Sequence, residues 1–417
     1  MIVLVNFNTY LGGGETLFVR FALYLHRNNI DYLAICKSDS FIFKELNRHH
    51  ISSEKLIRIE SNVDYYYLSK RNRRLLVEEI DKYLPRNNDL RFLTFCMRDL
   101  YTIVDLNNGT RGSISHLILH NQDYLYVCQT IVDKMRYKLK CERRFSAVKS
   151  KTFNRYLFNC VNNHRGMIPM SLIITKMWRK ELRIIMSESS IVPVPCINKN
   201  NNSILIKGEN EKKILWIGRL VDFKLSSLYV ILNFIKRRSD YTLSIIGDGN
   251  KAIVDKYIED NQIPKENIRF LGQIRYDDLK DVILKHSIGY ASGSSIIEIA
   301  KYGLPVIMAL QDNKHILFKR DICGGLFCNT TKGNFAEDLC IYKESEISIT
   351  IDDVISEIEA DYHGCAQKFY DYTVAEYDED TNFAQYVRLI ESTESFTEKI
   401  LVPQASIIRR YIYNRLK

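Results

Sequence analysis

Short apolar runs alternate with longer amphipathic segments along most of the chain. Four runs in the first half predict strands, at 2–7, 32–36, 91–96 and 114–119, and three segments predict helices, at 15–27, 66–83 and 171–182. The second half predicts five strands, at 213–217, 241–246, 268–271, 288–291 and 305–310, and four helices, at 225–238, 251–262, 276–286 and 295–302. Strands that alternate with helices at this spacing indicate an α/β protein with parallel, doubly wound sheets.

The chain length of 417 residues suits two domains better than one. An asparagine-rich polar stretch at 198–203 has the composition of a linker between them. We therefore predict an N-terminal Rossmann-like domain at 1–196 and a linker at 197–210. A second Rossmann-like domain follows at 211–370, and C-terminal helices with a basic tail occupy 371–417. In the last part, 381–391 predicts a helix, and the acidic stretch 376–380 predicts a solvated turn.

Composition narrows the class of protein. A hydrophobic content of 46% and a charged content of 26% are typical of a globular protein that buries cores. The chain has neither an apolar run long enough to span a membrane nor an N-terminal signal peptide, so we predict a cytoplasmic location. Ten cysteines without paired C-x2-C spacing indicate reduced thiols rather than a disulfide or zinc framework.

The residues that follow each predicted strand are candidates for ligand binding, because ligands of open α/β sheets bind beyond the carboxyl ends of the strands. After the apolar run 214–217 come Gly218, Arg219 and, five residues beyond the arginine, Lys224. Two cations at one strand end match a diphosphate, since a guanidinium binds phosphate as a planar fork and an ammonium as a point charge. Taken alone, the pair is more simply explained as ordinary surface cations.

Two other strand ends in the second half are compatible with a ligand. Gly247 and Gly249 permit a tight turn and the close approach of a ligand to the backbone. Ser294 and Ser295 open a short helix whose N-terminus suits a phosphate, and Glu298, one turn later, suits ribose hydroxyls. The alternative for this helix is simple N-capping by serine with a solvated glutamate.

The order of these elements resembles a known family. Four motifs follow one another, which are Gly-Arg-Leu-x-x-x-Lys at 218–224, Ile-Gly-Asp-Gly at 246–249, Arg-Phe-Leu-Gly at 269–272 and Glu-Ile-Ala-x-x-Gly-x-Pro-Val at 298–306. Together they resemble the donor-binding domain of family-four glycosyltransferases of the kind acting in bacterial surface polysaccharide synthesis, such as lipopolysaccharide or capsule. These enzymes have the GT-B architecture, in which two Rossmann-like domains face a cleft.

The resemblance implies roles for the strand-end residues. Arg219 and Lys224 would bind the donor diphosphate and stabilise it as the leaving group, and Glu298 would bind the ribose. Further donor contacts are implied at four positions, Gly247, Gly249, Ser294 and Ser295. The family commonly has a second glutamate eight positions before the first, where it contacts the transferred sugar, but here that position is Tyr290.

The N-terminal half carries two further segments that the resemblance assigns. A Gly-Gly-Gly-Glu sequence ending at Glu15 resembles the family's glycine loop, and it implies donor contacts at Gly13 and Gly14 and an acceptor contact at Glu15. His120 occupies the place of a family histidine and would be catalytic, and Asp123 would contact the acceptor. A loop histidine satisfied by backbone groups is the alternative for His120.

Taken together, the resemblance implies a hexosyltransferase that moves a sugar from a nucleotide-diphosphate donor, such as a UDP- or GDP-sugar, to a glycan or lipid-linked glycan. Such enzymes usually act with retention, and we expect neither a metal nor a cofactor. Two alternatives stay open, a catalytically weak GT-B scaffold or binding subunit and a nucleotide-sugar 2-epimerase. The Asp-x-Asp pattern at 378–380, which binds metal in another glycosyltransferase fold, is assigned to the acidic turn instead.

The net charge of +9 is concentrated in two stretches. The segment 134–155 holds nine Lys and Arg against one acid, and 399–417 holds five basic residues and no acid. Apolar residues in the tail are spaced to line one helical face, so we predict contact with an anionic membrane surface, which would suit a lipid-linked acceptor. The alternative is that these charges only keep the protein in solution, and no recognised module supports binding of nucleic acid.

Overall fold

The computed structural model describes residues 1–9, 12–61, 63–86, 89–108, 111–119, 147–197, 212–311, 321–335 and 349–405. The chain divides into two compact units, of which unit 1 comprises Met1–Val194 with Asp380–Lys417 and unit 2 comprises Pro195–Glu379. Several predicted features lie outside the described residues, namely His120, Asp123, most of the basic segment 134–155, the linker stretch 198–211 and the tail from 406 onward.

Unit 1 is built on a six-stranded parallel sheet in the order β3-β2-β1-β4-β5-β6. The strands are β1 (Ile2–Asn6), β2 (Tyr32–Lys37), β3 (Leu56–Ile59), β4 (Leu90–Thr94), β5 (Gly112–Ile118) and β6 (Met167–Pro169). The helices are α1 (Gly13–Arg27), α2 (Phe41–Arg48), α3 (Lys70–Asp81), α4 (Met97–Asn107), α7 (Ala147–Asn163), α8 (Leu172–Leu182) and α15 (Glu379–Ser392), with 3-10 turns η1 (Tyr65–Tyr67) and η3 (Glu188–Ser190).

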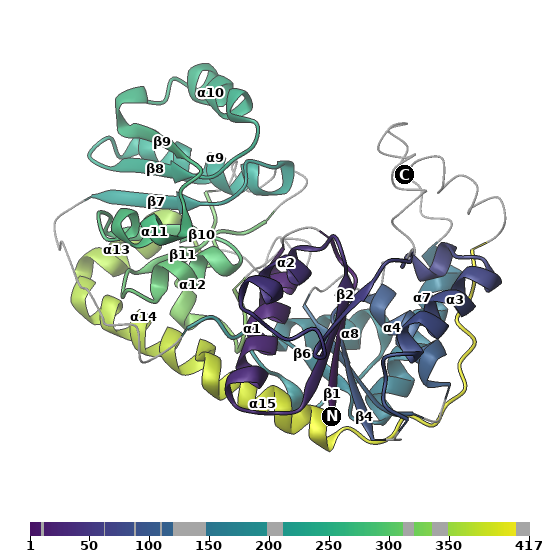
Figure 1. Cartoon of the computed structure of the whole chain (residues 1–417). Helices are drawn as coiled ribbons and strands as arrows, with labels where there is room; N and C mark the ends of the chain where they lie inside the picture. Colours follow the sequence, from purple (N-terminus) through teal and green to yellow (C-terminus); the bar gives the residue numbers. More distant parts are fainter. Residues whose placement is uncertain are drawn as a thin grey trace. The chain divides into compact units, whose positions relative to one another are not determined.

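Alternate residues of β1 enter two separate cores, as the period of a strand requires. Val3 and Val5 pack with α3, α4, α7 and α8, whereas Ile2 and Leu4 pack with α1, α2 and α15 on the other face. Both faces of the sheet are therefore covered by helices (Figure 1). This explains why its strands read as continuous apolar runs.

Unit 2 is built on a five-stranded parallel sheet in the order β11-β10-β7-β8-β9. The strands are β7 (Lys213–Ile217), β8 (Thr242–Ile246), β9 (Ile268–Gly272), β10 (Ile288–Ala291) and β11 (Val306–Met308). The helices are α9 (Asp222–Arg237), α10 (Lys251–Asp260), α11 (Tyr276–Ile283), α12 (Ser294–Ala300), α13 (Ile351–Ala360) and α14 (Tyr362–Tyr377), with 3-10 turns η5 (Lys265–Asn267) and η7 (Phe327–Asn329).

All the predicted strands are present, and the doubly wound α/β prediction is confirmed. Two strands were not predicted, β3 and β6, which are the short edges of the sheet in unit 1. The predicted helix at 66–83 is wrong at its start. Ser69 caps α3 by accepting a hydrogen bond from the Asn72 backbone, so the preceding tyrosines form the separate turn η1.

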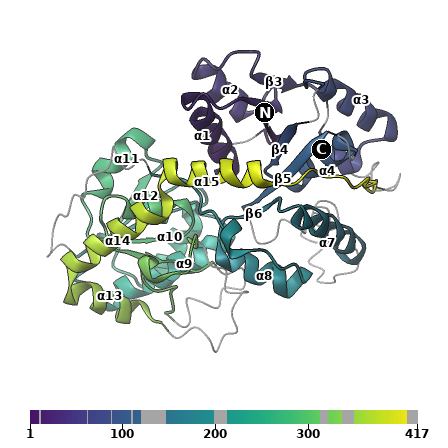
Figure 2. The ribbon, with the colours of Figure 1, turned by 90° about the horizontal axis from the view of Figure 1, so that it is seen from below.

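The chain beyond α14 returns to unit 1. Phe383 of α15 stacks on Phe21 of α1 with ring centroids 5.1 Å apart, and Figure 2 shows the two helices beside each other. The segment 393–405, which we call the C-terminal strap, then crosses unit 1. The Phe396 backbone donates to the Gly112 carbonyl at its start, and the Ala405 backbone donates to the Tyr66 carbonyl at its end.

The prediction of a solvated acidic turn at 376–380 is wrong. Asp378 lies between α14 and α15 and is only 3% exposed. The Glu379 backbone donates to the Ile197 carbonyl at 2.7 Å, so this junction pairs with the segment that enters unit 2. An acidic segment is solvated only where its backbone N–H and C=O groups are not hydrogen-bonded to another buried segment.

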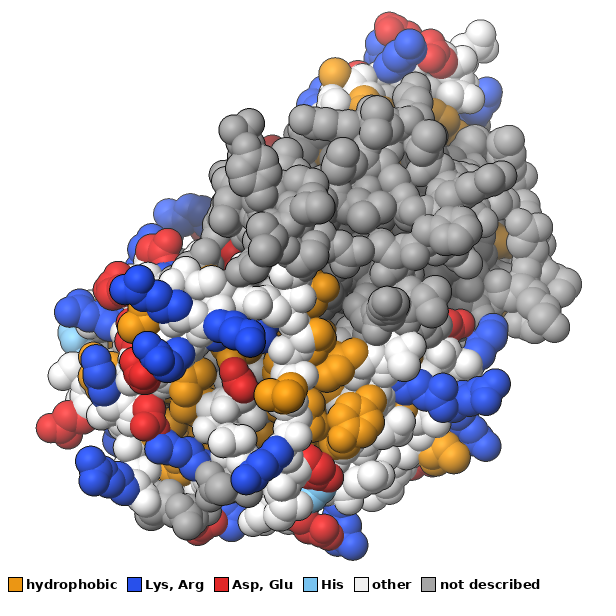
Figure 3. All heavy atoms as spheres, turned by 90° about the vertical axis from the view of Figure 1, so that its right-hand side faces the viewer, with side chains coloured by type: hydrophobic (Ala, Val, Ile, Leu, Met, Phe, Trp, Pro, Cys, Tyr) orange, Lys and Arg blue, Asp and Glu red, His pale blue; other side chains and the backbone are white. Residues whose placement is uncertain are grey.

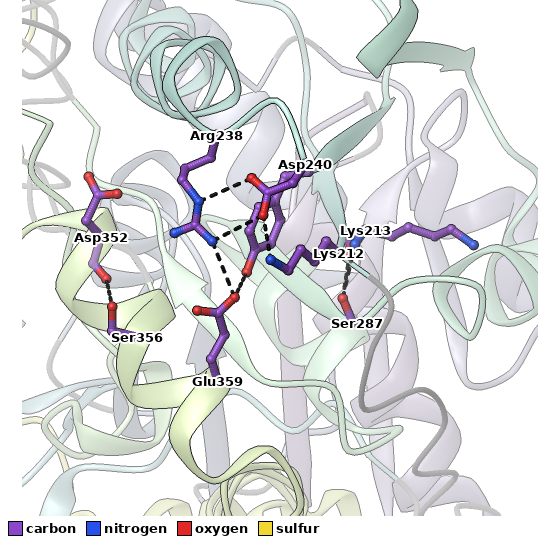
Figure 4. Close-up of polar contacts among 9 residues, drawn as sticks. Lys212, Lys213, Arg238, Asp240, Ser287, Asp352, Ser356 and Glu359 are labelled. Carbon is purple, nitrogen blue, oxygen red and sulfur yellow. Dashed lines mark hydrogen bonds and ion pairs between the residues drawn. The ribbon is translucent and has the colours of Figure 1, made fainter.

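A network of ion pairs and hydrogen bonds in unit 2 lies at the amino ends of its strands (Figure 4). Asp240 accepts from Lys212 at 2.5 Å and from Arg238 at 3.2 Å, and the Lys212 bond is the main reason why the pKa of this carboxyl falls to about 2. Tyr241 donates to Glu359 of α13 at 2.5 Å. Ligands of such sheets bind at the opposite, carboxyl edge, so we interpret this network as structural.

Candidate functional site

Unit 2 has a topological switch point between β7 and β10. The chain runs from β7 through β8 to β9 on one side of the sheet, and then returns to the other side for β10 and β11. The loops that leave β7 and β10 therefore diverge above neighbouring strands, where ligands of open sheets bind. Arg219 lies on the first loop, and Ser294 and Ser295 follow the second. The fold thus places two of the predicted motifs at adjacent strand ends.

The two predicted cations lie close together. Arg219 is exposed, and Lys224 is partly buried in the first turn of α9. The pKa of the Lys224 ammonium is lowered, mainly by burial and further by the positive charge of Arg219. The positive charge of Arg219 disfavours the charged form of Lys224, and an anion bound nearby would favour it.

Gly247 and Gly249 lie where the loop after β8 packs against the loop after β7. Gly247 has a φ of +152°, and a Cβ there would lie 1.7 Å from the Gly218 carbonyl oxygen. Gly249 has a φ of +134°, and a Cβ there would lie 2.6 Å from the Leu220 carbonyl oxygen. The Leu220 backbone donates to the Asp248 carbonyl at 2.8 Å across the same contact. These glycines therefore let two loops pack backbone to backbone on either side of Arg219.

The serine-capping alternative for α12 is wrong. Its N-cap is Gly293, with a φ of +76°, and no side chain caps the helix. Glu298 is not solvated either, because its side chain is 16% exposed and its Oε2 pairs with the Lys301 ammonium at 2.5 Å. Lys301 was not predicted, although its i,i+3 spacing from Glu298 was a usable signal. Ser294 is exposed and Ser295 is partly buried.

The sugar-contacting glutamate of the family has no counterpart in β10. Tyr290 occupies its position, is fully buried, and has a pKa raised well above its usual value by that burial. A second loop lies beside the start of α12 instead, since the Gly293 backbone donates to the Phe335 carbonyl at 2.7 Å. That loop is held by Glu376 of α14, whose Oε1 accepts from the Gly333 backbone at 2.9 Å. Burial raises the pKa of Glu376.

Unit 1 has its own switch point, between β1 and β4. The glycine loop follows β1, and Arg98 lies just after β4 in the first turn of α4. Glu15, at the start of α1, is only 4% exposed and accepts from Asn8 Nδ2 at 2.6 Å. The structure thus places Gly13 on the surface and Glu15 inside the protein. Neither Asn8 nor Arg98 was predicted, although both follow strands.

Two buried titratable groups of unit 1 belong to its core. Burial raises the pKa of Asp99 to about 6, although its Oδ1 accepts from the Phe7 backbone at 3.1 Å. Burial lowers the pKa of His116 to about 3, and its Nδ1 lies 2.8 Å from Thr94 Oγ1. His116 therefore stays neutral at neutral pH and is not a charged ligand group.

The described ranges show no signature of a metal site or of a membrane-spanning helix. No group of three or more His, Cys, Asp or Glu in them is arranged to hold a metal ion. None of the helices in these ranges is long and apolar enough to cross a membrane. The described cysteines are free thiols, and burial raises the pKa of Cys36 and of Cys323 to about 12.

Solved structures share this fold across nearly the whole chain. The Anabaena protein Alr3699/HepE, crystallised with UDP, superposes with a TM-score of 0.59 at 12% identity over 94% of this chain and 99% of its own. A glycosyltransferase from Rickettsia africae gives 0.61 at 14% identity over 94% and 98%. The lipopolysaccharide outer core galactosyltransferase WaaB gives 0.54 at 12% identity over 94% and 99%. No protein-family model matches the chain, and no curated protein matches its sequence. The chain therefore has the GT-B fold of these glycosyltransferases, which confirms the predicted fold.

Proposed function

We propose that the protein is a glycosyltransferase that uses a nucleotide-diphosphate sugar as donor. The observation that carries the proposal is the pair of cations at the switch point of unit 2, where Lys224 is partly desolvated beside Arg219. A diphosphate satisfies both cations at once, because it offers several anionic oxygens within a short span. The similarity in fold supports this class of reaction. HepE, one of the proteins with this fold, was crystallised with UDP.

The chemistry follows from the leaving group. When the sugar departs from the donor, negative charge grows on the diphosphate, and Arg219 and Lys224 stabilise that charge without reorganisation. We propose that transfer proceeds without a metal or other cofactor and with retention of the anomeric configuration. Glu298, held by Lys301, is proposed to bind the ribose. The acceptor is proposed to be a glycan or a lipid-linked glycan.

A thermal-shift screen with UDP, GDP and their sugars tests the donor proposal. A ligand present at 100 times its Kd is expected to add about 2.7 kcal/mol to the free energy of unfolding. Glucose and inorganic phosphate serve as controls, because neither supplies a diphosphate. If no nucleotide shifts the melting temperature while the protein melts cooperatively, the proposed donor site is wrong.

A scaffold role is separated from catalysis by product analysis. Purified protein incubated with the donor that shifts its melting temperature is expected to release the nucleoside diphosphate, slowly by hydrolysis and faster with a glycan acceptor. Binding without release would favour the scaffold alternative. Release of an epimerised nucleotide sugar would favour the epimerase alternative instead.

We also propose that unit 1 contacts an anionic membrane surface from the cytoplasmic side. The exposed residues Lys70, Arg71 and Arg74 lie on α3 with Leu75, which is 45% exposed, and Leu401 of the strap is 91% exposed. On the face of the protein drawn in Figure 3, hydrophobic side chains lie among basic and acidic ones. Apolar groups beside basic ones suit the headgroup region of an anionic bilayer.

Truncation after residue 405 tests the contribution of the basic tail. The cut must spare the strap, because Ile400 and Val402 are buried in the core of unit 1 and Arg73 donates to the Val402 carbonyl at 2.7 Å. The truncated protein is expected to keep its melting temperature and to sediment less with phosphatidylserine vesicles at low salt. Vesicles of phosphatidylcholine alone provide the control. Unchanged sedimentation would mean that the tail plays no part in membrane binding.

A further inference from the structure

Four polar side chains form a continuous chain at the switch point of unit 1. Asp64 Oδ1 accepts from Arg98 Nη1 at 3.2 Å, and a second guanidinium nitrogen of Arg98 donates to Asn8 Oδ1. Asn8 Nδ2 in turn donates to Glu15 Oε1 at 2.6 Å. We call this set the Asp64–Glu15 relay. It joins the segment after β3, the segment after β4 and the glycine loop, which are far apart in the sequence.

The relay is buried enough to be strong. The side chains of Arg98 and Asp64 are 13% and 11% exposed, and Glu15 as a residue is 4% exposed. Charges that are largely removed from water are weakly screened, so breaking a contact between them is costly. The relay therefore holds its segments more firmly than a surface ion pair would.

Asn8 is the directional member of the relay. Its amide accepts from Arg98 through oxygen and donates to Glu15 through nitrogen, which neither a carboxylate nor an ammonium does. A cation on one side and an anion on the other fix the amide in one orientation. The identity of the side chain at position 8 thus follows from the charges that flank it.

Glu15 connects these contacts to the glycine loop. It is the third residue of α1, and its carboxylate turns back so that a Cβ on Gly12 would lie 2.6 Å from Oε2. A carboxylate in the first turn also interacts favourably with the N-terminal end of the helix. The position of this side chain therefore fixes how the loop enters α1.

We propose that Arg98 and Asn8 are positioning residues for the glycine loop, and that Glu15 organises this loop rather than contacting the acceptor directly. The proposal deepens the proposed function, since the resemblance gives this loop a role in transfer. Loop geometry matters for such a reaction because a displacement of about 1 Å costs on the order of 100-fold in rate.

A double-mutant cycle with Arg98→Met and Asn8→Ala tests the relay. Amide hydrogen exchange at the start of α1 is expected to rise about tenfold or more in each single variant, the order expected when a buried ionic contact is broken. The double variant is expected to exchange no faster than Asn8→Ala alone, because both changes break the same chain. Peptides from unit 2 are expected to exchange as in the native protein.

Two further variants make the result specific. Arg98→Lys keeps the charge without the planar fork and is expected to restore part of the protection. Arg48→Met is the matched control, since Arg48 of α2 is exposed and pairs only loosely with Glu45 at 3.7 Å, and it is expected to change nothing. Transfer rate is expected to fall about 100-fold in Arg98→Met, whereas the Kd of the nucleotide for the Arg219 site changes less than threefold.

The outcomes separate the two proposals. Unchanged exchange in Arg98→Met, or additive effects in the double variant, would overturn the relay whatever reaction the protein catalyses. Increased exchange with an unaltered transfer rate would overturn the positioning role of the loop. If the native protein transfers no sugar, the proposed function fails, and the exchange data still decide whether the relay exists.

Discussion

Replacing Arg219 by alanine is expected to lower kcat/KM for the donor by about 100- to 1,000-fold, the usual effect of removing one preorganised group from a developing oxyanion. The effect is expected to be large because Arg219 lies close enough to Lys224 for its charge to lower the pKa of that ammonium, so both cations can act on one diphosphate. Steady-state kinetics with the donor found by the binding screen provide the measurement.

Three companion variants sharpen this expectation. Arg219→Lys retains the charge but loses the fork and is expected to recover part of the rate. Lys224→Ala is expected to be less than additive with Arg219→Ala, because both cations act on one diphosphate. Lys251→Ala removes an exposed lysine of unit 2 that pairs with Asp255 at 2.7 Å, and it is expected to leave the rate unchanged. A native rate in Arg219→Ala would show that the diphosphate binds elsewhere.

Substituting Gly247 by alanine is expected to lower the free energy of unfolding of unit 2 by about 3 kcal/mol or more, which is the range of backbone strain combined with a steric clash. The reason is that the new Cβ would meet the Gly218 carbonyl oxygen at 1.7 Å, where only backbone can yield. If the variant folds, the loop that carries Arg219 must move, so nucleotide affinity is expected to fall as well. Chemical unfolding and nucleotide titration measure the two effects.

Gly272 is the matched control for this substitution. It also has a positive φ, of +65°, but a Cβ there would meet no atom within 4 Å, and its carbonyl accepts from the Gly247 backbone. Gly272→Ala is therefore expected to cost only about 1 kcal/mol, the usual penalty of a left-handed residue, and to leave nucleotide affinity intact. Equal losses in the two variants would show that conformation alone, and not the contact between loops, requires glycine at 247.

The sequence predicted the fold well where local signals are strong. The strands β7 and β10 were predicted with their observed bounds, because a buried parallel strand is a short apolar run of β-branched and aromatic residues. The edge strands β3 and β6 were missed. β3 has four residues with an exposed Arg58 among them, and β6 has three and ends at Pro169, so neither carries enough pattern to be recognised.

The candidate site was predicted in part. Arg219 and Lys224 were identifiable because they follow a clear strand in a motif of fixed spacing. Asn8 and Arg98 also follow strands, but their importance depends on each other, and only the pairing of β1 with β4 brings their segments together. Lys301 could have been predicted as the partner of Glu298 from their i,i+3 spacing, whereas no local pattern indicates that Glu15 is buried.

By itself, the sequence determined the alternation of strands and helices, the presence of two α/β halves, and the two cations after β7. Each of these depends on residues near one another in the chain. The tertiary structure decided the rest. Strand order sets where the switch points lie, and it is a property of long-range pairing, so it alone brings the β7 and β10 loops together. Packing between distant segments likewise buries Asp378 and Glu15, since the solvation of a carboxylate depends on which segments pack against it.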